Sequence, residues 1–146
     1  RGLPPPQLTI FDAPTRESCI ARRERTNTPL QALLLMNEEQ HFFAAMYLAN
    51  NVIDQSDLSD DEKIVVAYET ITSRLPDEKT VRQLQSARNG FAELYANDPH
   101  EAAAMFGDVS DSSIRDSADP EQQIELASWT MLMHSILNLD ITKTRE

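Results

Sequence analysis

Apolar residues recur every three or four positions through most of the chain after residue 28, which is the spacing of one face of an α-helix. Short polar stretches interrupt this pattern, and the periodic segments follow capping residues, prolines or acidic residues. The expected helices cover about 29–54, 60–75, 77–95, 99–106 and 120–139. The pattern predicts an all-α fold, a bundle of five to six helices.

The first of these helices has the clearest start. Thr28 is a good N-cap, and Pro29 follows at the first helical position, where its missing N–H has no cost. Asn37-Glu38-Glu39-Gln40 resembles a second cap with acidic first-turn residues, so we expect the helix to kink or restart there. Its first part has an apolar face formed by Leu30, Leu33, Leu34 and Met36.

Residues 1–27 show no sustained period. Pro4-Pro5-Pro6 imposes an extended path and removes backbone donors. Leu8, Ile10 and Phe11 could form a short extended contact such as an edge strand, and Phe11-Asp12-Ala13-Pro14 is typical of a turn. The sequence therefore predicts an irregular, proline-containing N-terminal arm over 1–27 and a helical bundle over 28–146.

Charge is distributed unevenly along the chain. The net charge is −11, but residues 1–30 carry +2, which leaves −13 for the remainder. An acidic body of this kind argues against nucleic acid as a partner, and no apolar run is long enough for membrane insertion. The basic arm either lies across its own acidic helices or serves as a binding tail. Its charges come from Arg1, Arg16, Arg22, Arg23 and Arg25 against Asp12, Glu17 and Glu24.

Two strings in the first third of the chain resemble a known family. They are FDAPTRE, Phe11–Glu17, and RERTNTPLQAL, Arg23–Leu33. The chain resembles the C-terminal domain of unknown function in large planctomycete proteins that also carry a cytochrome-c-like domain. The family pattern usually has Asn-Asp-Pro where this chain has Asn37-Glu38-Glu39. The segment from Trp129 to Asp140 also fits the family.

The resemblance implies a longer parent protein, with a signal peptide and a haem domain upstream of this C-terminal domain. It also implies an exported or periplasmic location. No activity is known for this domain, so the resemblance supplies no catalytic residues. We expect no cofactor in this part of the chain, because it lacks a haem-attachment motif and paired metal-binding cysteines.

The junction between arm and first helix is the leading candidate site. The backbone N–H groups of Leu30 and Gln31 should point outward from the helix N-terminus, where the partial charge is positive. A sulfate, phosphate or carboxylate group suits that chemistry. The alternative is that Arg22 and Arg25 pair with acidic residues of the body or of an upstream domain. The candidate anion-binding residues are Arg22, Arg25, Asn27, Thr28 and Gln31.

Three other features carry weaker chemistry. Cys19 is the only cysteine and is more consistent with a small apolar residue than with a reactive thiol, although arginines lie nearby. Glu38-x-x-His41 matches half of a di-iron motif, but His100 and His134 have no glutamate three residues before them, so no metal site is expected. Asp12 is expected to form a turn or to pair with an arginine.

Two hypotheses for function follow. In the favoured one the chain is a structural or interaction module without activity, in which the arm contacts upstream domains of the parent chain. This version predicts that the isolated chain dimerises through the arm or leaves it loosely ordered, because the apolar residues of the arm have nothing local to bury them. The alternative is an anion- or glycan-binding site contributed to an enzyme that acts on sulfated polysaccharide.

Overall fold

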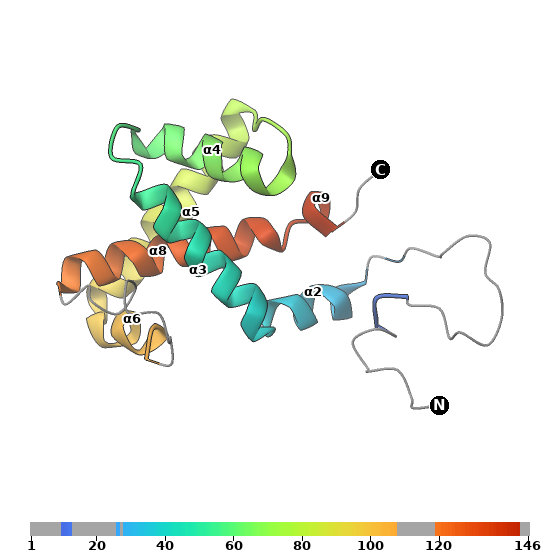
Figure 1. Ribbon diagram of the computed structural model, residues 1–146, viewed down its shortest axis with the longest axis horizontal. Coiled ribbons are helices and arrows are strands. Elements are labelled where there is room, and N and C mark those ends of the chain that lie inside the picture. The colour runs from blue at the N-terminus through green and yellow to red at the C-terminus, as the bar shows by residue number, and fades with distance from the viewer. Residues whose placement is uncertain (1–9, 13–25, 27, 108–118, 144–146) are drawn as a thin grey trace.

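The computed structural model describes residues 10–12, 26, 28–107 and 119–143, and the secondary structure of these residues is helical, without strands. Figure 1 shows helices crossing at varied angles around α8, while α2 extends away from the others. The all-α prediction is confirmed. The helices are α2 (Pro29–Met36), α3 (Glu39–Ile53), α4 (Asp60–Thr72), α5 (Glu78–Asn97), α6 (Pro99–Met105), α8 (Pro120–Leu137) and α9 (Asp140–Lys143).

Helix α8 is the centre of the core. It contacts α3 and α5 most extensively and also touches α4, α6 and α9. Trp129 and Leu132 on this helix are completely buried, and they pack with Met46 of α3 and Ile64 of α4. A helix surrounded on several sides loses its polar face. The buried residues of α8 are Leu126, Ala127, Ser128, Trp129, Thr130, Leu132, Met133, His134 and Ile136.

The helix caps largely follow the sequence expectations. The capping box at the start of α4 is present, with the Ser59 hydroxyl accepting from the N–H of Glu62 and the Glu62 carboxylate accepting from the N–H of Ser59. Asp77 and Asp119 likewise cap α5 and α8 through their side chains. The expectation that the α4 stripe continues to Leu75 is wrong, because Ser73 adopts a left-handed conformation and ends the helix.

One charged side chain is packed into the core region between three helices. The Arg88 guanidinium of α5 lies 5.2 Å from the ring centroid of the buried Trp129 in α8. It also pairs with the Asp60 carboxylate at the start of α4, at 2.9 Å. The arginine is therefore positioned by a cation–π contact and an ion pair at once.

The long N-terminal helical segment breaks as predicted, but Asn37 has a different role. Helix α2 ends at Met36 and α3 begins at Glu39. Asn37 is the C-cap of α2, with its side-chain amide donating to the Leu33 carbonyl, whereas Glu38 is the N-cap of α3. Asn37 therefore ends the first helix and does not cap the second.

Most of the apolar face expected for α2 is exposed, and only its Leu34 is partly buried. Leu30, Leu33 and Met36 are more than half exposed, whereas the polar Gln31 is only 4% exposed. The reason is that α2 turns its Gln31 side toward the arm and has few contacts with the other helices. Among the described residues, no helix is both long and apolar enough to cross a membrane.

Candidate functional site

The Gln31 side chain is the hub of the junction between arm and first helix. Its Nε2 donates to the carbonyl oxygen of Ile10 at 2.8 Å and to the hydroxyl of Thr26 at 3.0 Å. Its Oε1 accepts from the backbone N–H of Thr28 at 3.1 Å. A buried amide satisfied in this way stabilises one arrangement of the chain, because each lost contact leaves a buried polar group unpaired. Gln31 thus links the 10–12 segment to the start of α2.

Asp12 provides the second link in this junction. Its carboxylate oxygen Oδ2 accepts from the backbone N–H of Thr26 at 2.8 Å and from the Thr26 hydroxyl at 2.7 Å. Its backbone has a φ of 55°, in the left-handed region that Asp tolerates better than most residues. The expectation that Asp12 forms a turn is confirmed, since Phe11 and Asp12 lie in a turn after the helical Ile10. These residues do not form the expected strand.

The N-terminus of α2 is occupied by the protein's own side chains. The Gln31 N–H donates to the Thr28 hydroxyl, and the Thr28 N–H donates to the Gln31 side chain, which completes a capping box. The expectation that the Gln31 N–H points outward is therefore wrong. Thr28 and Gln31 lie together and bind each other. Arg22, Arg25 and Asn27 lie outside the described residues, as does Cys19, so anion binding by these arginines stays a prediction.

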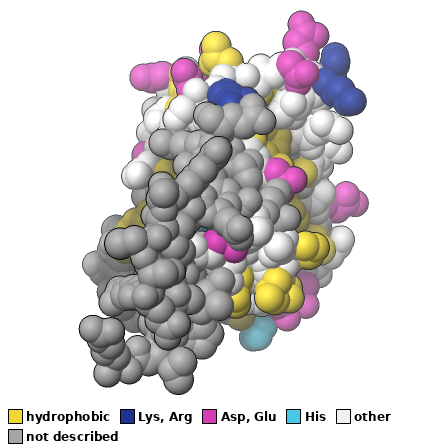
Figure 2. All heavy atoms as spheres, turned by 90° about the vertical axis from the view of Figure 1, so that its right-hand side faces the viewer, with side chains coloured by type: hydrophobic (Ala, Val, Ile, Leu, Met, Phe, Trp, Pro, Cys, Tyr) yellow, Lys and Arg dark blue, Asp and Glu magenta, His cyan; other side chains and the backbone are white. Residues whose placement is uncertain are grey.

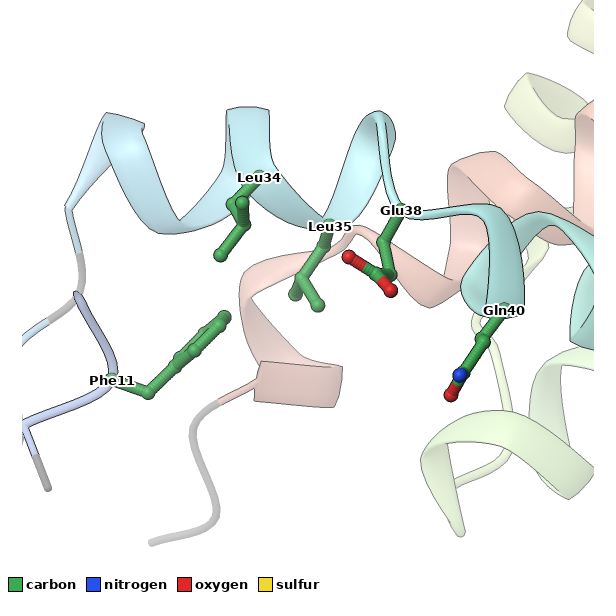
Figure 3. A pocket seen from close by; sticks show the side chains of 5 residues that line it. All are labelled: Phe11, Leu34, Leu35, Glu38 and Gln40. Carbon is green, nitrogen blue, oxygen red and sulfur yellow. The ribbon is translucent and has the colours of Figure 1, made fainter. Parts of the chain in front are cut away.

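A groove of about 350 Å³ lies beside this junction. Figure 3 shows Leu34 and Leu35 of α2 pointing toward the ring of Phe11, with the carboxylate of Glu38 on the same side of the chain. Gln40, at the start of α3, completes the lining. The groove is thus apolar along α2 and carries one carboxylate where α2 meets α3. Phe11 was expected to lack local apolar neighbours, but the two leucines of α2 provide them.

The opposite side of α2 presents an apolar surface. Leu30, Leu33 and Met36 are 55%, 57% and 55% exposed, and we call these three side chains the α2 outer face. The helix sequence, PLQALLLM, contains no charged residue, although the chain carries a net charge of −11. On the face shown in Figure 2, acidic side chains appear in several places, whereas Lys and Arg appear only near its upper end. The outer face is therefore an uncharged patch on an acidic protein.

Glu38, the N-cap residue of α3, and His41, in its first turn, lie close enough for the carboxylate to influence the imidazole. His41 is half-buried, and this burial lowers the pKa of its imidazole while the nearby Glu38 carboxylate opposes the shift. Within the described ranges, no group of three or more His, Cys, Asp and Glu side chains is arranged to hold a metal ion. His41 does, however, contact His134 of α8, a neighbour that the sequence analysis did not connect with it.

A family model matches residues 1–87, which extend from the arm into α5. The family is PSD1, described as a protein of unknown function (DUF1553). This match covers more than half of the chain. The chain belongs to the PSD1 family. No curated protein and no solved structure matches it. The junction, the groove and the α2 outer face of this PSD1 chain all lie within the matched residues.

Sequence reasoning missed one residue of the PSD1 junction and the exposed surface on the other side of α2. Thr26 was absent from the candidate residues, although its N–H and hydroxyl donate to Asp12 and its hydroxyl accepts from Gln31. The exposure of the α2 outer face was also missed. The lack of any charged residue from Pro29 to Met36 was a signal for it, because an uncharged helix at the edge of an acidic body differs from ordinary surface helices.

Proposed function

We propose that this chain is a structural or interaction module, without activity of its own, in a longer exported protein. In this proposal the parent chain is a planctomycete protein with a cytochrome-c-like domain upstream, and this C-terminal module docks onto the upstream part. The resemblance of Phe11–Glu17 and Arg23–Leu33 supports the parent architecture. Membership of a family of unknown function is consistent with a module that lacks an established reaction.

The α2 outer face is the observation that carries the docking role. Three large apolar side chains are exposed together on two helical turns, and contiguous exposed apolar patches can mark interaction sites. On its other side, the Gln31 hydrogen bonds tie the start of this helix to its own N-cap and to the Ile10 carbonyl. A preorganised helix reduces the entropy lost on binding.

The absence of charge in α2 supports the same role. An acidic body resists association through most of its surface, because like charges repel when two surfaces approach. A neutral apolar helix avoids this penalty. The groove beside Phe11 then gives a partner side chain a place to insert next to the helix.

Thiol labelling of the complete parent protein tests this proposal. In a Cys19→Ser background, Leu33→Cys reports on the α2 outer face, and Leu94→Cys is the matched control on α5, since the two leucines are 57% and 58% exposed. We expect the thiol introduced by Leu33→Cys to react quickly in the isolated chain and at least about tenfold more slowly in the parent, because burial removes the thiol from reagent. The thiol introduced by Leu94→Cys should react equally in both. Equal reactivity of the Leu33→Cys variant in the two proteins contradicts docking through α2.

Binding of sulfated glycan is the second proposal, and it rests on the arginines of the arm. Because Thr28 and Gln31 are engaged with each other, an anion would have to be bound chiefly by Arg22 and Arg25. Titration of a sulfated oligosaccharide into the chain and into Arg25→Ala, with Arg82→Ala as an exposed control on α5, tests it. If only Arg25→Ala binds the oligosaccharide more weakly, the result supports the site. Equal binding by the unmodified chain, Arg25→Ala and Arg82→Ala contradicts it.

A further inference from the structure

Two histidines from distant parts of the chain meet where α2, α3 and α8 come together. The ring centroids of His41 in α3 and His134 in α8 are 6.0 Å apart, with an angle of 68° between the ring planes. The Phe42 ring also packs edge-on against His134, with 5.8 Å between the centroids. A hydrogen bond joins the His134 ring to the backbone of Leu35 in α2. His134 therefore connects α8 to the last turn of α2 and to the first turn of α3.

Each of the two imidazoles has a nitrogen that the described residues leave unpaired. His134 is only 6% exposed, and its Nε2 is shielded from solvent without a hydrogen-bond partner among these residues. His41 is half-buried, and the same holds for its Nδ1. A neutral imidazole has a proton on one ring nitrogen, whereas an imidazolium has a donor on both. Protonation of either ring therefore puts a positive charge and an unpaired donor in a shielded place, which is unfavourable.

Few of the described charged groups compensate for such a charge. From α3, the Glu38 carboxylate favours the protonated form of His41. From α2, which contains no charged residue, His134 receives only the hydrogen bond to the Leu35 backbone. Helices α4, α5, α6 and α9 also pack against α8, but within the described ranges the charge that acts on His134 is that of His41. Two protonated rings at this distance repel each other.

The direction of the pKa shifts agrees with this geometry. Burial lowers the pKa of His41 below its ordinary value of 6.5, and Glu38 only opposes the shift. Burial, and then the charge of His41, lower the pKa of His134 against the effect of the Leu35 hydrogen bond. Rings that become open to water regain their ordinary pKa, so an open form binds protons more readily than the closed form. The closed form therefore keeps its full stability above pH 6.5 and loses stability as pH falls from there through the two lowered pKa values.

Helix α2 is the element that can move most easily when the closed form loses stability. It has few contacts with the other helices, whereas α8 packs extensively against α3 and α5. Figure 1 shows α2 extending away from the other helices and meeting α3 at a corner. Local opening occurs where the fewest contacts have to break. Acid should therefore loosen this corner before it unfolds the core around α8.

We propose that the contact between His41 and His134 is a pH-sensitive switch, which holds the corner between α2 and α3 against α8 and releases it when the two rings take up protons. Buried histidines serve as switches because imidazole changes its charge in the mildly acidic range. The orientation of α2, and with it that of the α2 outer face, then depends on pH. The switch does not depend on which partner α2 contacts, so it stands independently of the docking role.

Urea denaturation of histidine variants of the complete chain tests the switch. Between about pH 7.5 and 5.5 the ratio of folded to unfolded chain should fall, by up to tenfold for each unit by which folding lowers the two pKa values together. The fall should be several times smaller in His41→Gln and in His134→Gln, because an amide takes up no proton in this range. His100→Gln, at the exposed histidine of α6, is the matched control and should respond as the unmodified chain does.

Nuclear magnetic resonance of the unmodified chain locates the switch without any substitution, and it decides the matter if a histidine variant does not fold. The chain has three histidines, so each imidazole can be followed separately. His41 and His134 should titrate at lower pH than His100, and the amide signals of residues 35–42 should change with the same midpoints, whereas those of α5 should not. Titration of His134 at or above the midpoint of His100, or corner signals that do not follow the two rings, overturns the proposal. An equal acid response of the unmodified chain and folded His41→Gln overturns it as well.

Discussion

Helices α8 and α2 both carry many apolar residues but occupy opposite environments. In α8 a continuous run from Leu126 to Thr130 is buried, including the polar Ser128 and Thr130. In α2 the only buried residue is Gln31, and three large apolar side chains are exposed. Apolar content therefore does not decide burial. What decides it is the number of neighbouring elements, which is large for α8 and small for α2.

This difference separates the parts of the chain that maintain the fold from the part available to a partner. Side chains of α8 fill the space between α3, α5 and α6, so changes there should alter the free energy of unfolding. Side chains of the α2 outer face touch little else in the described structure, so changes there should alter docking and leave stability almost unchanged. The following predictions test this contrast with matched substitutions.

The largest effect is expected for two leucine truncations of identical chemistry. Leu132→Ala in α8 should lower the free energy of unfolding by about 2–5 kcal/mol, because Leu132 is fully buried and its loss leaves a cavity. Leu33→Ala on the α2 outer face should change it by no more than about 0.5 kcal/mol. Urea denaturation of both variants measures the difference. A similar loss for the two variants would mean that α2 is packed in solution.

The second effect is local and concerns the buried polar residue of α2. Gln31→Ala removes partners from the Ile10 carbonyl, the Thr26 hydroxyl and the Thr28 N–H, so it should lower the local opening free energy by about 1–3 kcal/mol. Hydrogen exchange at the Thr26 and Thr28 amides should then accelerate roughly ten- to hundredfold. The exposed Gln83 on α5 is the control. Unchanged exchange in Gln31→Ala would show that the junction does not depend on this amide.

A smaller effect is expected at the charged contact of the core. Arg88→Ala removes both the stacking on Trp129 and the pair with Asp60, and should lower the free energy of unfolding by about 1–2 kcal/mol. Asp60→Asn should cost only about 0.2–1 kcal/mol, because that carboxylate is half exposed. Arg82→Ala, whose exposed pair with Glu78 spans 3.9 Å, is the control and should have almost no effect. If Arg82→Ala lowers the free energy of unfolding as much as Arg88→Ala does, the stacking of Arg88 on Trp129 contributes nothing to stability.

The smallest effect is a pH dependence at the α4 cap. Hydrogen bonds from the Ser59 hydroxyl and then from its backbone N–H lower the pKa of Glu62 below its ordinary value of 4.5. The folded state therefore gains stability from the ionised carboxylate above that value and loses it as pH falls through the lowered pKa. The melting-temperature difference between wild type and Glu62→Gln should shrink on acidification. Glu69→Gln, on the same helix, should keep the wild-type pH dependence of the melting temperature. If Glu69→Gln changes this pH dependence as much as Glu62→Gln does, the effect comes from the charge of the helix and not from the cap.

The helix boundaries could be predicted because their causes are local. A capping side chain and its N–H partners lie within three residues of each other, so Thr28, Ser59, Asp77 and Asp119 identify helix starts without knowledge of the fold. The end of α4 was not predicted correctly. A serine in the left-handed conformation is uncommon, and the spacing of Leu75 alone suggested a longer helix.

The candidate site lies only partly within the described residues. The sequence directed attention to the arm-to-helix junction, where Thr28 and Gln31 do meet. It could not show that Gln31 would use its amide on Ile10 and Thr26, since those contacts depend on how the arm folds back. The pairing of His41 with His134 was likewise invisible, because 93 positions separate them and only the crossing of α3 over α8 brings them together.

The sequence by itself determined the helical class of this protein, most of its helix starts, and the neutral, leucine-rich character of α2. These properties depend on propensities and hydrogen bonds among residues close in sequence. Only the tertiary structure decided which apolar faces are covered, which polar side chains are buried, and which distant rings and charges meet. The physical reason is that burial is a property of neighbouring elements in space, so the same kind of apolar stripe forms the core in α8 and a surface in α2.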